Sequence, residues 1–284
     1  MDLFDSNTTT MPALNALTAM AETVEAEFMY AYESGAPSPV RAALGIATAR
    51  IGGGVVLAMA EDPGQYWNKA LGFGVCEPVT AGLLDEIIGF YRAHGVQRAT
   101  IQIAPSLLPP DWGGIRQAHG LSAGAVVVKL GADVDELDPQ AATDLRVEPV
   151  WPGDAAQWAE VIVRGNGAPD ERIAGMIAAG AAQPGFQPYA AWAGGDLVAG
   201  ANLLVRGLVG ALNSAATLPG HRGRGAQSAL IAARIEAARR AGCRWVTAEA
   251  ALPAAGAVNP SLANLERAGL RGLYLRRDWI WHAN

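Results

Sequence analysis

The spacing of hydrophobic positions in the last third of the chain predicts alternating strands and helices. A short apolar run at 212–218 has the character of a strand, and 228–241 continues with the uninterrupted pattern of a helix. A further strand is predicted at 244–250. This order favours an α/β (α+β) fold in which helices pack on a mixed sheet.

The first half of the chain carries a weaker copy of this order. Gly95 and Gly120 lie 25 residues apart and Gly242 and Gly269 lie 27 apart, and each pair brackets a strand followed by a helix. The segments of the earlier copy are strands at 45–51, 54–60, 69–75, 99–104 and 124–130, and helices at 84–92 and 115–121.

We therefore predict two tandem domains, at 1–135 and 145–284, joined by a segment rich in Asp, Glu, Pro and Gln at 133–144. Residues 1–10 are expected to lack regular structure. The following residues, 11–33, predict an amphipathic helix with its solvent face at Glu22, Glu25 and Glu27.

The composition is that of a globular protein. With 284 residues, 51% of them hydrophobic, the chain can bury a large core. No run of about 18 apolar residues and no signal-peptide pattern occurs, so we expect a cytoplasmic protein that does not enter a membrane. Cys76 and Cys243 lack C-x-x-C spacing and are expected to be buried rather than to form a disulfide, a metal site or a nucleophile. No metal is expected.

Charge is unevenly divided along the chain. Residues 222–284 contain ten arginines and four acidic residues, a net charge of +6, so the remainder carries −12 of the total of −6. A basic segment suits a ligand with phosphate groups, and an acidic remainder favours a cationic acceptor. The acidic pI, about 5.3, argues against nucleic-acid binding. Arg234, Arg239 and Arg240 are expected to form a solvated helix face.

The most informative segment is Pro-Gly-His-Arg-Gly-Arg-Gly-Ala-Gln at 219–227, between the strand at 212–218 and the helix at 228–241. Successive backbone N–H groups in a glycine-rich turn that opens a helix form a partly positive concave site, and two arginines add charge to it. Such a site suits a diphosphate.

This segment resembles motif A of the GNAT superfamily of N-acetyltransferases, R/Q-x-x-G-x-G/A. Arg222 and Gly225 match the motif, and Gln227 stands where the family has a small residue. The resemblance extends from about Leu145 to Asn284, where 259–269 looks like the superfamily's last helix and 271–281 like its final pair of strands. It implies two tandem acyl-CoA N-acyltransferase folds with acetyl-CoA as cosubstrate. It assigns cofactor contacts to Ala216, Thr217, Leu218, Arg222, Gly223, Arg224, Gly225, Ala226, Gln227, Asn259 and Asn264.

The corresponding segment of the first copy is Cys76-Glu-Pro-Val-Thr-Ala-Gly82, which has no arginine and places a carboxylate at Glu77. A carboxylate facing a diphosphate repels it. The first copy is therefore expected to have lost the cofactor and to serve as a structural or substrate-shaping half.

Superfamily chemistry, as the resemblance implies it, is direct attack of an amine on a thioester, which needs a base and an acid. Glu249, at the end of the strand at 244–250, is the candidate base. An ion pair with Arg244 or another neighbouring arginine explains Glu249 equally well. His221 is a second candidate, since imidazole titrates near neutral pH.

The acid is less evident, because Leu265 occupies the position at which the family commonly has a tyrosine. Tyr274 is the substitute candidate, and packing of its ring beside Trp279 and Trp281 is the alternative.

Two functions follow from these expectations. The first is an N-acetyltransferase acting on a small primary amine, an amino acid, an aminoglycoside-like amine or a peptide terminus, as a monomer or homodimer. The second is a non-catalytic acyl-CoA-binding sensor or scaffold, which the missing tyrosine would permit.

Overall fold

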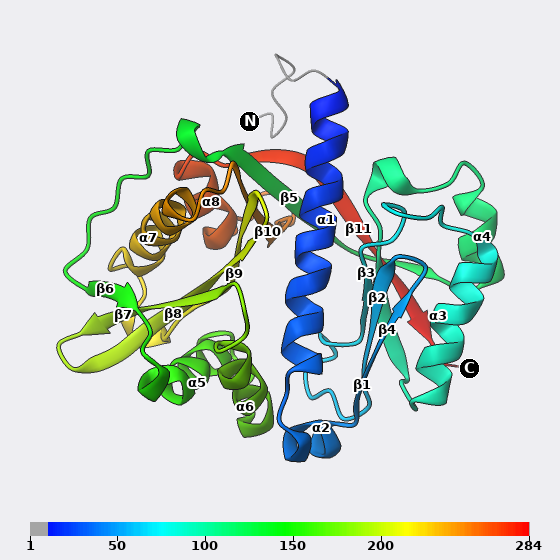
Figure 1. Ribbon diagram of the computed structural model, residues 1–284, viewed down its shortest axis with the longest axis horizontal. Coiled ribbons are helices and arrows are strands. Elements are labelled where there is room, and N and C mark those ends of the chain that lie inside the picture. The colour runs from blue at the N-terminus through cyan, green and yellow to red at the C-terminus, as the bar shows by residue number, and fades with distance from the viewer. Residues whose placement is uncertain (1–10, 284) are drawn as a thin grey trace. The chain divides into compact units, whose positions relative to one another are not determined.

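The computed structural model describes residues 11–283, which divide into two compact units (Figure 1). The first unit is Lys129–Leu273, and the second combines 11–128 with 274–283. The expectation for residues 1–10 lies outside the described residues.

The first unit is a mixed sheet covered by helices. Its strands are β6 (Arg146–Pro149), β7 (Phe186–Ala193), β8 (Asp196–Arg206), β9 (Val209–Thr217) and β10 (Trp245–Ala251), and its helices are α5 (Ala155–Gly165), α6 (Glu171–Gly180), α7 (Ala226–Arg240) and α8 (Pro260–Arg267). β6 to β9 are antiparallel neighbours, whereas β9 and β10 are parallel. A parallel pair needs a crossover, and α7 supplies it.

The second unit has the same succession of strand pairings. Its elements are α1 (Met11–Ser34), α2 (Ser38–Leu44), β1 (Ile46–Ile51), β2 (Gly54–Met59), β3 (Lys69–Leu71), α3 (Ala81–Ala93), β4 (Arg98–Gln102) and α4 (Trp112–Ala118). β1, β2 and β3 are antiparallel neighbours and β3 is parallel to β4, with α3 as the crossover. The predicted α/β fold with a mixed sheet is therefore confirmed.

Short 3-10 turns complete the chain at η1 (Pro105–Leu107), η2 (Val134–Glu136), η3 (Pro152–Asp154) and η4 (Pro219–His221).

Two long strands, β5 (Ser122–Asp133) and β11 (Arg271–His282), contribute to both units. In the strand order β4-β11-β5-β10, each is a neighbour of the other. The unit boundary cuts β5 after Val128 and β11 after Leu273, so each unit holds one part of each strand. The pair of strands predicted within 271–281 is one continuous strand. The predicted domain boundaries follow the order of the chain. In the structure, the end of β5 belongs to the first unit and the end of β11 belongs to the second.

The outward position predicted for three glutamates of α1 is wrong. Glu22 is 1% exposed, and both of its carboxylate oxygens accept hydrogen bonds at 2.8 Å from Nη1 of Arg276, which is fully buried. Glu25 accepts from Nη2 of the same arginine, and Glu27 pairs with Arg50. These acidic residues hold α1 on its sheet instead of facing solvent.

Two other burial expectations also fail. Arg234, expected on a solvated face, is 1% exposed, whereas Arg240 on the same helix is exposed as predicted. Cys76 is exposed, although Cys243 is buried as expected.

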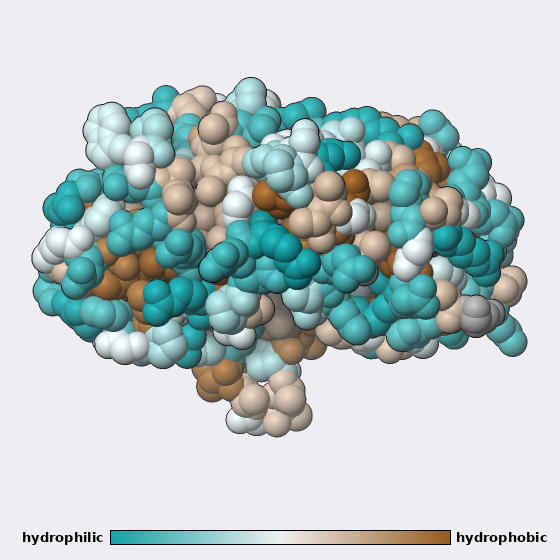
Figure 2. Space-filling model, turned by 90° about the horizontal axis from the view of Figure 1, so that it is seen from below, coloured by the Kyte–Doolittle hydropathy of each residue, from teal (hydrophilic) through white to brown (hydrophobic). Residues whose placement is uncertain are grey.

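No helix among residues 11–283 is long and apolar enough to cross a membrane. The face drawn in Figure 2 mixes hydrophilic and hydrophobic residues. Exposed large hydrophobic side chains come from four separate loops, at Tyr66, Trp151, Leu208 and Val258. Single exposed residues of this kind are normal on a folded protein.

Candidate functional site

The glycine-rich loop between β9 and α7 folds as an open helix N-terminus. Gly223 and Gly225 have φ angles of 77° and 78°, in the left-handed region that glycine adopts without strain. Gly225 is the N-cap of α7, and no side chain caps this end of the helix. The first amide groups of α7 therefore remain available to an anion.

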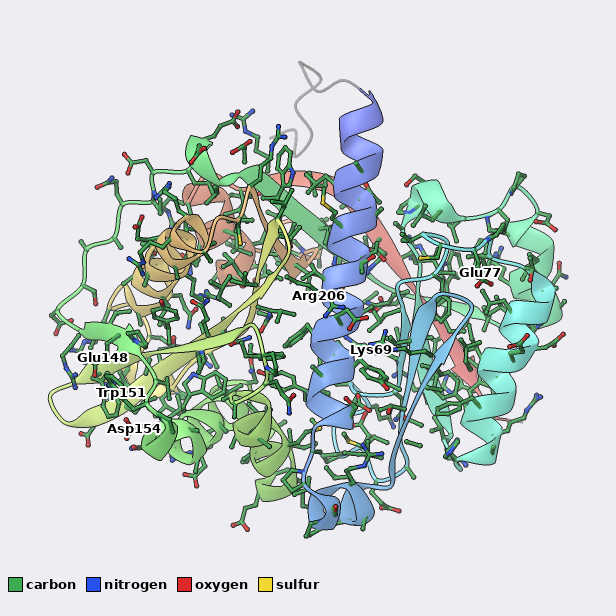
Figure 3. The ribbon with its side chains drawn as sticks, in the orientation of Figure 1. Lys69, Glu77, Glu148, Trp151, Asp154 and Arg206 are labelled. Carbon is green, nitrogen blue, oxygen red and sulfur yellow. The ribbon has the colours of Figure 1, made fainter. Side chains whose placement is uncertain are left out.

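The matching helix of the second unit differs at this end. The hydroxyl of Thr80, the N-cap of α3, accepts a hydrogen bond from the Leu83 N–H at 3.2 Å. Glu77 lies exposed in the loop just before it (Figure 3). A capped terminus beside a carboxylate is poorly suited to an anion.

β9 and β10 separate beside the glycine-rich loop. Their parallel pairing ends at Leu212 with Ala248, while β9 continues to Thr217 and β10 to Ala251. A register shift against β8 falls in the same stretch of β9, and Ser214 there has a φ of 47°. A bulge of this kind re-aims backbone groups next to a site.

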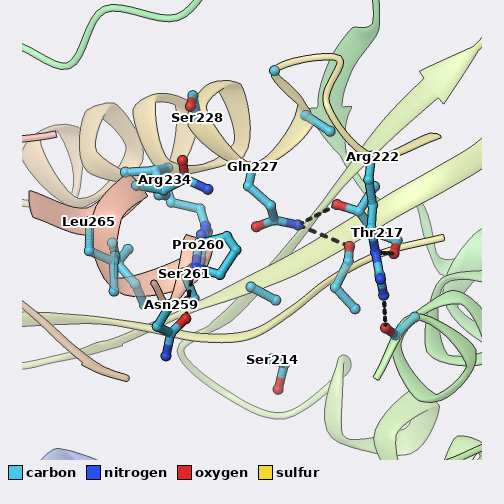
Figure 4. Close-up of a pocket in the computed structure, with 18 of the residues that line it drawn as sticks. Ser214, Thr217, Arg222, Gln227, Ser228, Arg234, Asn259, Pro260, Ser261 and Leu265 are labelled. Carbon is cyan, nitrogen blue, oxygen red and sulfur yellow. Dashed lines mark hydrogen bonds between the residues drawn. The ribbon is translucent and has the colours of Figure 1, made fainter. Parts of the chain in front are cut away.

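A cavity of about 860 Å³ occupies this opening (Figure 4). This volume lies within the range of small-molecule pockets, roughly 300–1,000 Å³. The lining includes the end of β9 (Leu212–Thr217), the glycine-rich loop, the start of α7, Glu249 of β10 and one side of α8.

Nine of the eleven predicted cofactor residues line this cavity. They are Ala216, Thr217, Arg222, Gly223, Gly225, Ala226, Gln227, Asn259 and Asn264. Leu218 and Arg224 are not among the lining residues.

Arg224 instead joins the loop to the segment that contains Thr143 and Asp144. Its guanidinium pairs with Asp144, a contact that lowers the pKa of that carboxyl. The hydroxyl of Thr143 donates to the Arg224 carbonyl at 2.7 Å. The segment between the two halves of the chain therefore braces the glycine-rich loop.

Arg222 and Gln227 tie the loop to neighbouring elements (Figure 4). Nη2 of Arg222 donates to the Gly165 carbonyl at 3.0 Å. The Gln227 amide donates to the Ala216 carbonyl at 3.0 Å and to the Thr217 hydroxyl at 2.9 Å. The side chain at the position where the motif has a small residue therefore bonds to the end of β9.

Arg234 lies in the third turn of α7 and lines the cavity. It donates from Nε to the Leu230 carbonyl and from Nη1 to the Asn202 carbonyl, both at 3.0 Å. Burial lowers its pKa to about 9. The guanidinium therefore stays charged at neutral pH. Its hydrogen bonds join α7 to β8 beside the bulge.

The two asparagines on α8 both have local partners. Oδ1 of Asn259 accepts from the Ser261 N–H at 2.9 Å, which caps the helix as the Asn-Pro sequence predicts. Oδ1 of Asn264 accepts from Nη1 of Arg267 at 2.8 Å.

Glu249 lines the cavity, with 23% of its side chain exposed. Its ion-pair partner is Lys129 of β5, whose ammonium lies 3.1 Å from Oε2 and whose side chain is 3% exposed. The predicted alternative partner, Arg244, pairs with Asp133 instead. Sequence reasoning missed Lys129, although a lone lysine within Val-Val-Val-Lys-Leu was a detectable signal, because buried lysines are rare unless paired.

Tyr274 is not among the residues that line the cavity. Its hydroxyl donates to Oε1 of Glu22 at 2.7 Å, and burial together with this carboxylate raises its pKa. The rings of Trp279 and Trp281, the alternative packing partners, contact Trp112 and Tyr91. A hydroxyl held by a buried carboxylate is a poor proton donor, so Tyr274 is dropped as the candidate acid.

His221 lines the cavity, with Nδ1 3.2 Å from Nη1 of Arg224.

Residues 156–259, which include the opened strand pair and the glycine-rich loop, match the family model of the acetyltransferase (GNAT) family. The protein therefore carries a domain of the GNAT superfamily. No curated protein sequence matches the chain.

Solved structures extend the likeness of the fold to nearly the whole chain. A tandem GNAT protein from the clavulanic acid biosynthesis pathway is 18% identical with a TM-score of 0.58, over 97% of this chain and 96% of that one. A GCN5-related N-acetyltransferase from Sphaerobacter thermophilus is 16% identical with a TM-score of 0.56, over 75% and 71%. One from Kribbella flavida is 16% identical with a TM-score of 0.55, over 84% and 90%. The protein thus has the fold of a tandem GNAT protein.

Proposed function

We propose that the protein is an N-acetyltransferase that transfers the acetyl group of acetyl-CoA to a primary amine, most simply that of a small molecule. The observation that carries the proposal is the uncapped N-terminus of α7, which faces a cavity between two separating parallel strands. Glycine-rich helix starts bind phosphate groups, and the opened edge of β9 offers backbone partners to an extended chain.

The residues of the cavity fit the parts of acetyl-CoA. The amides of Gly225 and Ala226 suit the diphosphate, and Arg222 and Arg267 add positive charge to the lining. Residues 213–217 suit the pantetheine arm, as a strand edge suits a further strand. When bound, acetyl-CoA supplies the activated acyl group.

Glu249 is the proposed base. It takes a proton from the ammonium of the acceptor, and the freed amine nitrogen then forms a bond to the thioester carbonyl carbon as the C–S bond breaks. The sulfur leaves with the electron pair and takes a proton from water, and water accepts the second proton that the newly bonded nitrogen releases, since Leu265 stands where relatives have a tyrosine. A positioned base contributes about 10²–10⁴ in rate, so Glu249→Gln is expected to reduce kcat on that scale.

The second unit is proposed to be a degenerate GNAT copy that no longer binds acetyl-CoA. Its helix terminus is occupied by the Thr80 cap, and Glu77 adds negative charge to the preceding loop. A single acetyl-CoA site per chain is therefore expected.

Calorimetric titration with acetyl-CoA tests the site directly. The variant Arg222→Glu with Gly225→Glu should lose binding, since it places two carboxylates and a strained residue in the loop. Arg240→Glu with Gly195→Glu makes the same change in charge outside the cavity and should bind as the parent does.

Binding that survives in the first variant would refute the location of the site. Binding without turnover of any amine would support the acyl-CoA sensor instead of the enzyme.

A further inference from the structure

We propose that Lys129 is a positioning residue for Glu249, and that the first half of the chain thereby contributes to the reaction through strand β5. This inference rests on the proposed function, because it assigns a role beside the proposed base.

In the ion pair of Lys129 and Glu249, the lysine side chain is buried and the glutamate lines the cavity. The Lys129 side chain is 3% exposed, and its ammonium lies 3.1 Å from Oε2 of Glu249. The Glu249 side chain is 23% exposed and lines the cavity. A buried ammonium in contact with a carboxylate holds that carboxylate in one direction.

The register of β5 determines that Lys129 reaches this position. The Val134 N–H donates to the Arg244 carbonyl at 2.8 Å, just before β10 begins. Five residues before Val134 along β5, the Lys129 ammonium contacts Glu249 of the neighbouring strand β10. A shift of one residue would turn Lys129 to the opposite face of the sheet.

Gly131 helps to hold β5 in this register. A Cβ atom at this position would lie 2.9 Å from Cδ1 of Leu273 on β11 and 3.4 Å from the Val246 carbonyl on β10. The absence of a side chain lets β5 lie closely between its two neighbours, so Lys129 is held by the sheet itself.

The consequence concerns the first half of the chain. Lys129 follows directly on the part of β5 that belongs to the second unit, yet it contacts the proposed base of the first unit. The first half of the chain therefore supplies, through β5, a residue of the first unit that contacts the proposed base.

The test is a cycle of four variants, Lys129→Met, Lys129→Arg, Glu249→Gln and Lys129→Met with Glu249→Gln. Turnover of acetyl-CoA is followed by thiol release with ethanolamine, L-lysine, kanamycin and trialanine as acceptors. Acetyl-CoA affinity and thermal unfolding are measured for each variant.

We expect Lys129→Met to lower kcat by about 10-fold or more, because a small displacement of a catalytic group can cost up to about 100-fold. Acetyl-CoA affinity should be unchanged and Lys129→Arg should restore much of the rate. In the Glu249→Gln background, loss of Lys129 should have no further effect, since the residue acts through Glu249.

If Lys129→Met does not fold, the inference is tested with Lys129→Arg and with the double variant Lys129→Met with Glu249→Gln. Neither of these variants leaves a buried charge unpaired. Additive effects of the two substitutions, or an unchanged kcat in Lys129→Met, would overturn the inference alone. Absence of turnover by the parent protein despite acetyl-CoA binding would overturn the proposed function, and the inference with it.

Discussion

At the scale of single residues, helix α1 buries a carboxyl group that makes stability depend on pH. Glu33, near the end of α1, is fully buried, and neither carboxylate oxygen has a hydrogen-bond partner among the described residues. Burial raises the pKa of this carboxyl well above its usual range, and Asp62 raises it further, while Lys69 and Arg41 act in the opposite direction. The native state therefore holds a proton that the unfolded chain releases.

This proton makes stability depend on pH in a defined direction. Above the usual glutamate pKa of about 4.3 the unfolded state loses the proton first, so the free energy of unfolding decreases as pH rises toward the native pKa. Glu33→Gln removes this dependence, and the variant should gain stability over the parent as pH rises from 4 to 8. Urea denaturation at several pH values measures the difference, and a constant difference would contradict the argument.

At the scale of elements, each of the two strands shared by the units, β5 and β11, places a buried cationic side chain beside a carboxylate. β11 brings Arg276 to Glu22 and Glu25 of α1, and β5 brings Lys129 to Glu249 of β10. Such pairs stabilise little compared with apolar packing but are costly to break, because the remaining charge is left unpaired. They favour one arrangement of strands over others.

Removal of the Glu22 charge tests this view. Glu22→Gln should destabilise the protein by about 3 kcal/mol, the lower end for a broken buried pair, because Arg276 keeps Glu25. Glu27→Gln is the control: its partner Arg50 has a side chain that is 53% exposed. Exposed pairs contribute about 0–1 kcal/mol, so this variant should remain close to the parent in guanidinium denaturation. Equal losses in the two variants would contradict the assigned difference.

At the scale of the whole molecule, the division of the chain into units does not follow the order of the sequence. The first unit needs β5 beside β10, and the second needs the end of β11 beside β4. A fragment with the boundaries expected from sequence, 145–284, therefore lacks a strand of its own sheet and the lysine that pairs with Glu249.

We expect this fragment to fail to fold, whereas the intact chain unfolds cooperatively. β10 would present an unpaired and largely apolar edge, which favours aggregation. Circular dichroism and amide hydrogen exchange on the purified fragment check this, with the intact chain as the reference. A stable, acetyl-CoA-binding fragment would show that the exchanged strand is dispensable.

The sequence predicted the parts of the site that are local in the chain. The glycine-rich loop, the start of α7, the Asn259 cap and the order of strands and helices all depend on neighbouring residues and on hydrophobic period. The loop residues Gly223 and Gly225 were identified from the glycine-rich turn that opens a helix and from the motif, and both have positive φ angles. The direction of Arg224 could not be predicted, because its guanidinium pairs with Asp144, which is distant in the chain.

The tertiary structure alone decided which charges are buried and which strands are neighbours. Glu22 and Arg276 are 254 residues apart, and no local pattern relates them. The same holds for Lys129 and Glu249, which meet only because β5 lies against β10 in one register. The sequence by itself determined an α/β chain with a glycine-rich loop at the start of a helix, since these follow from local backbone preference and period. Folding decided the strand exchange and the partner of the proposed base, since both arise from pairing between distant segments.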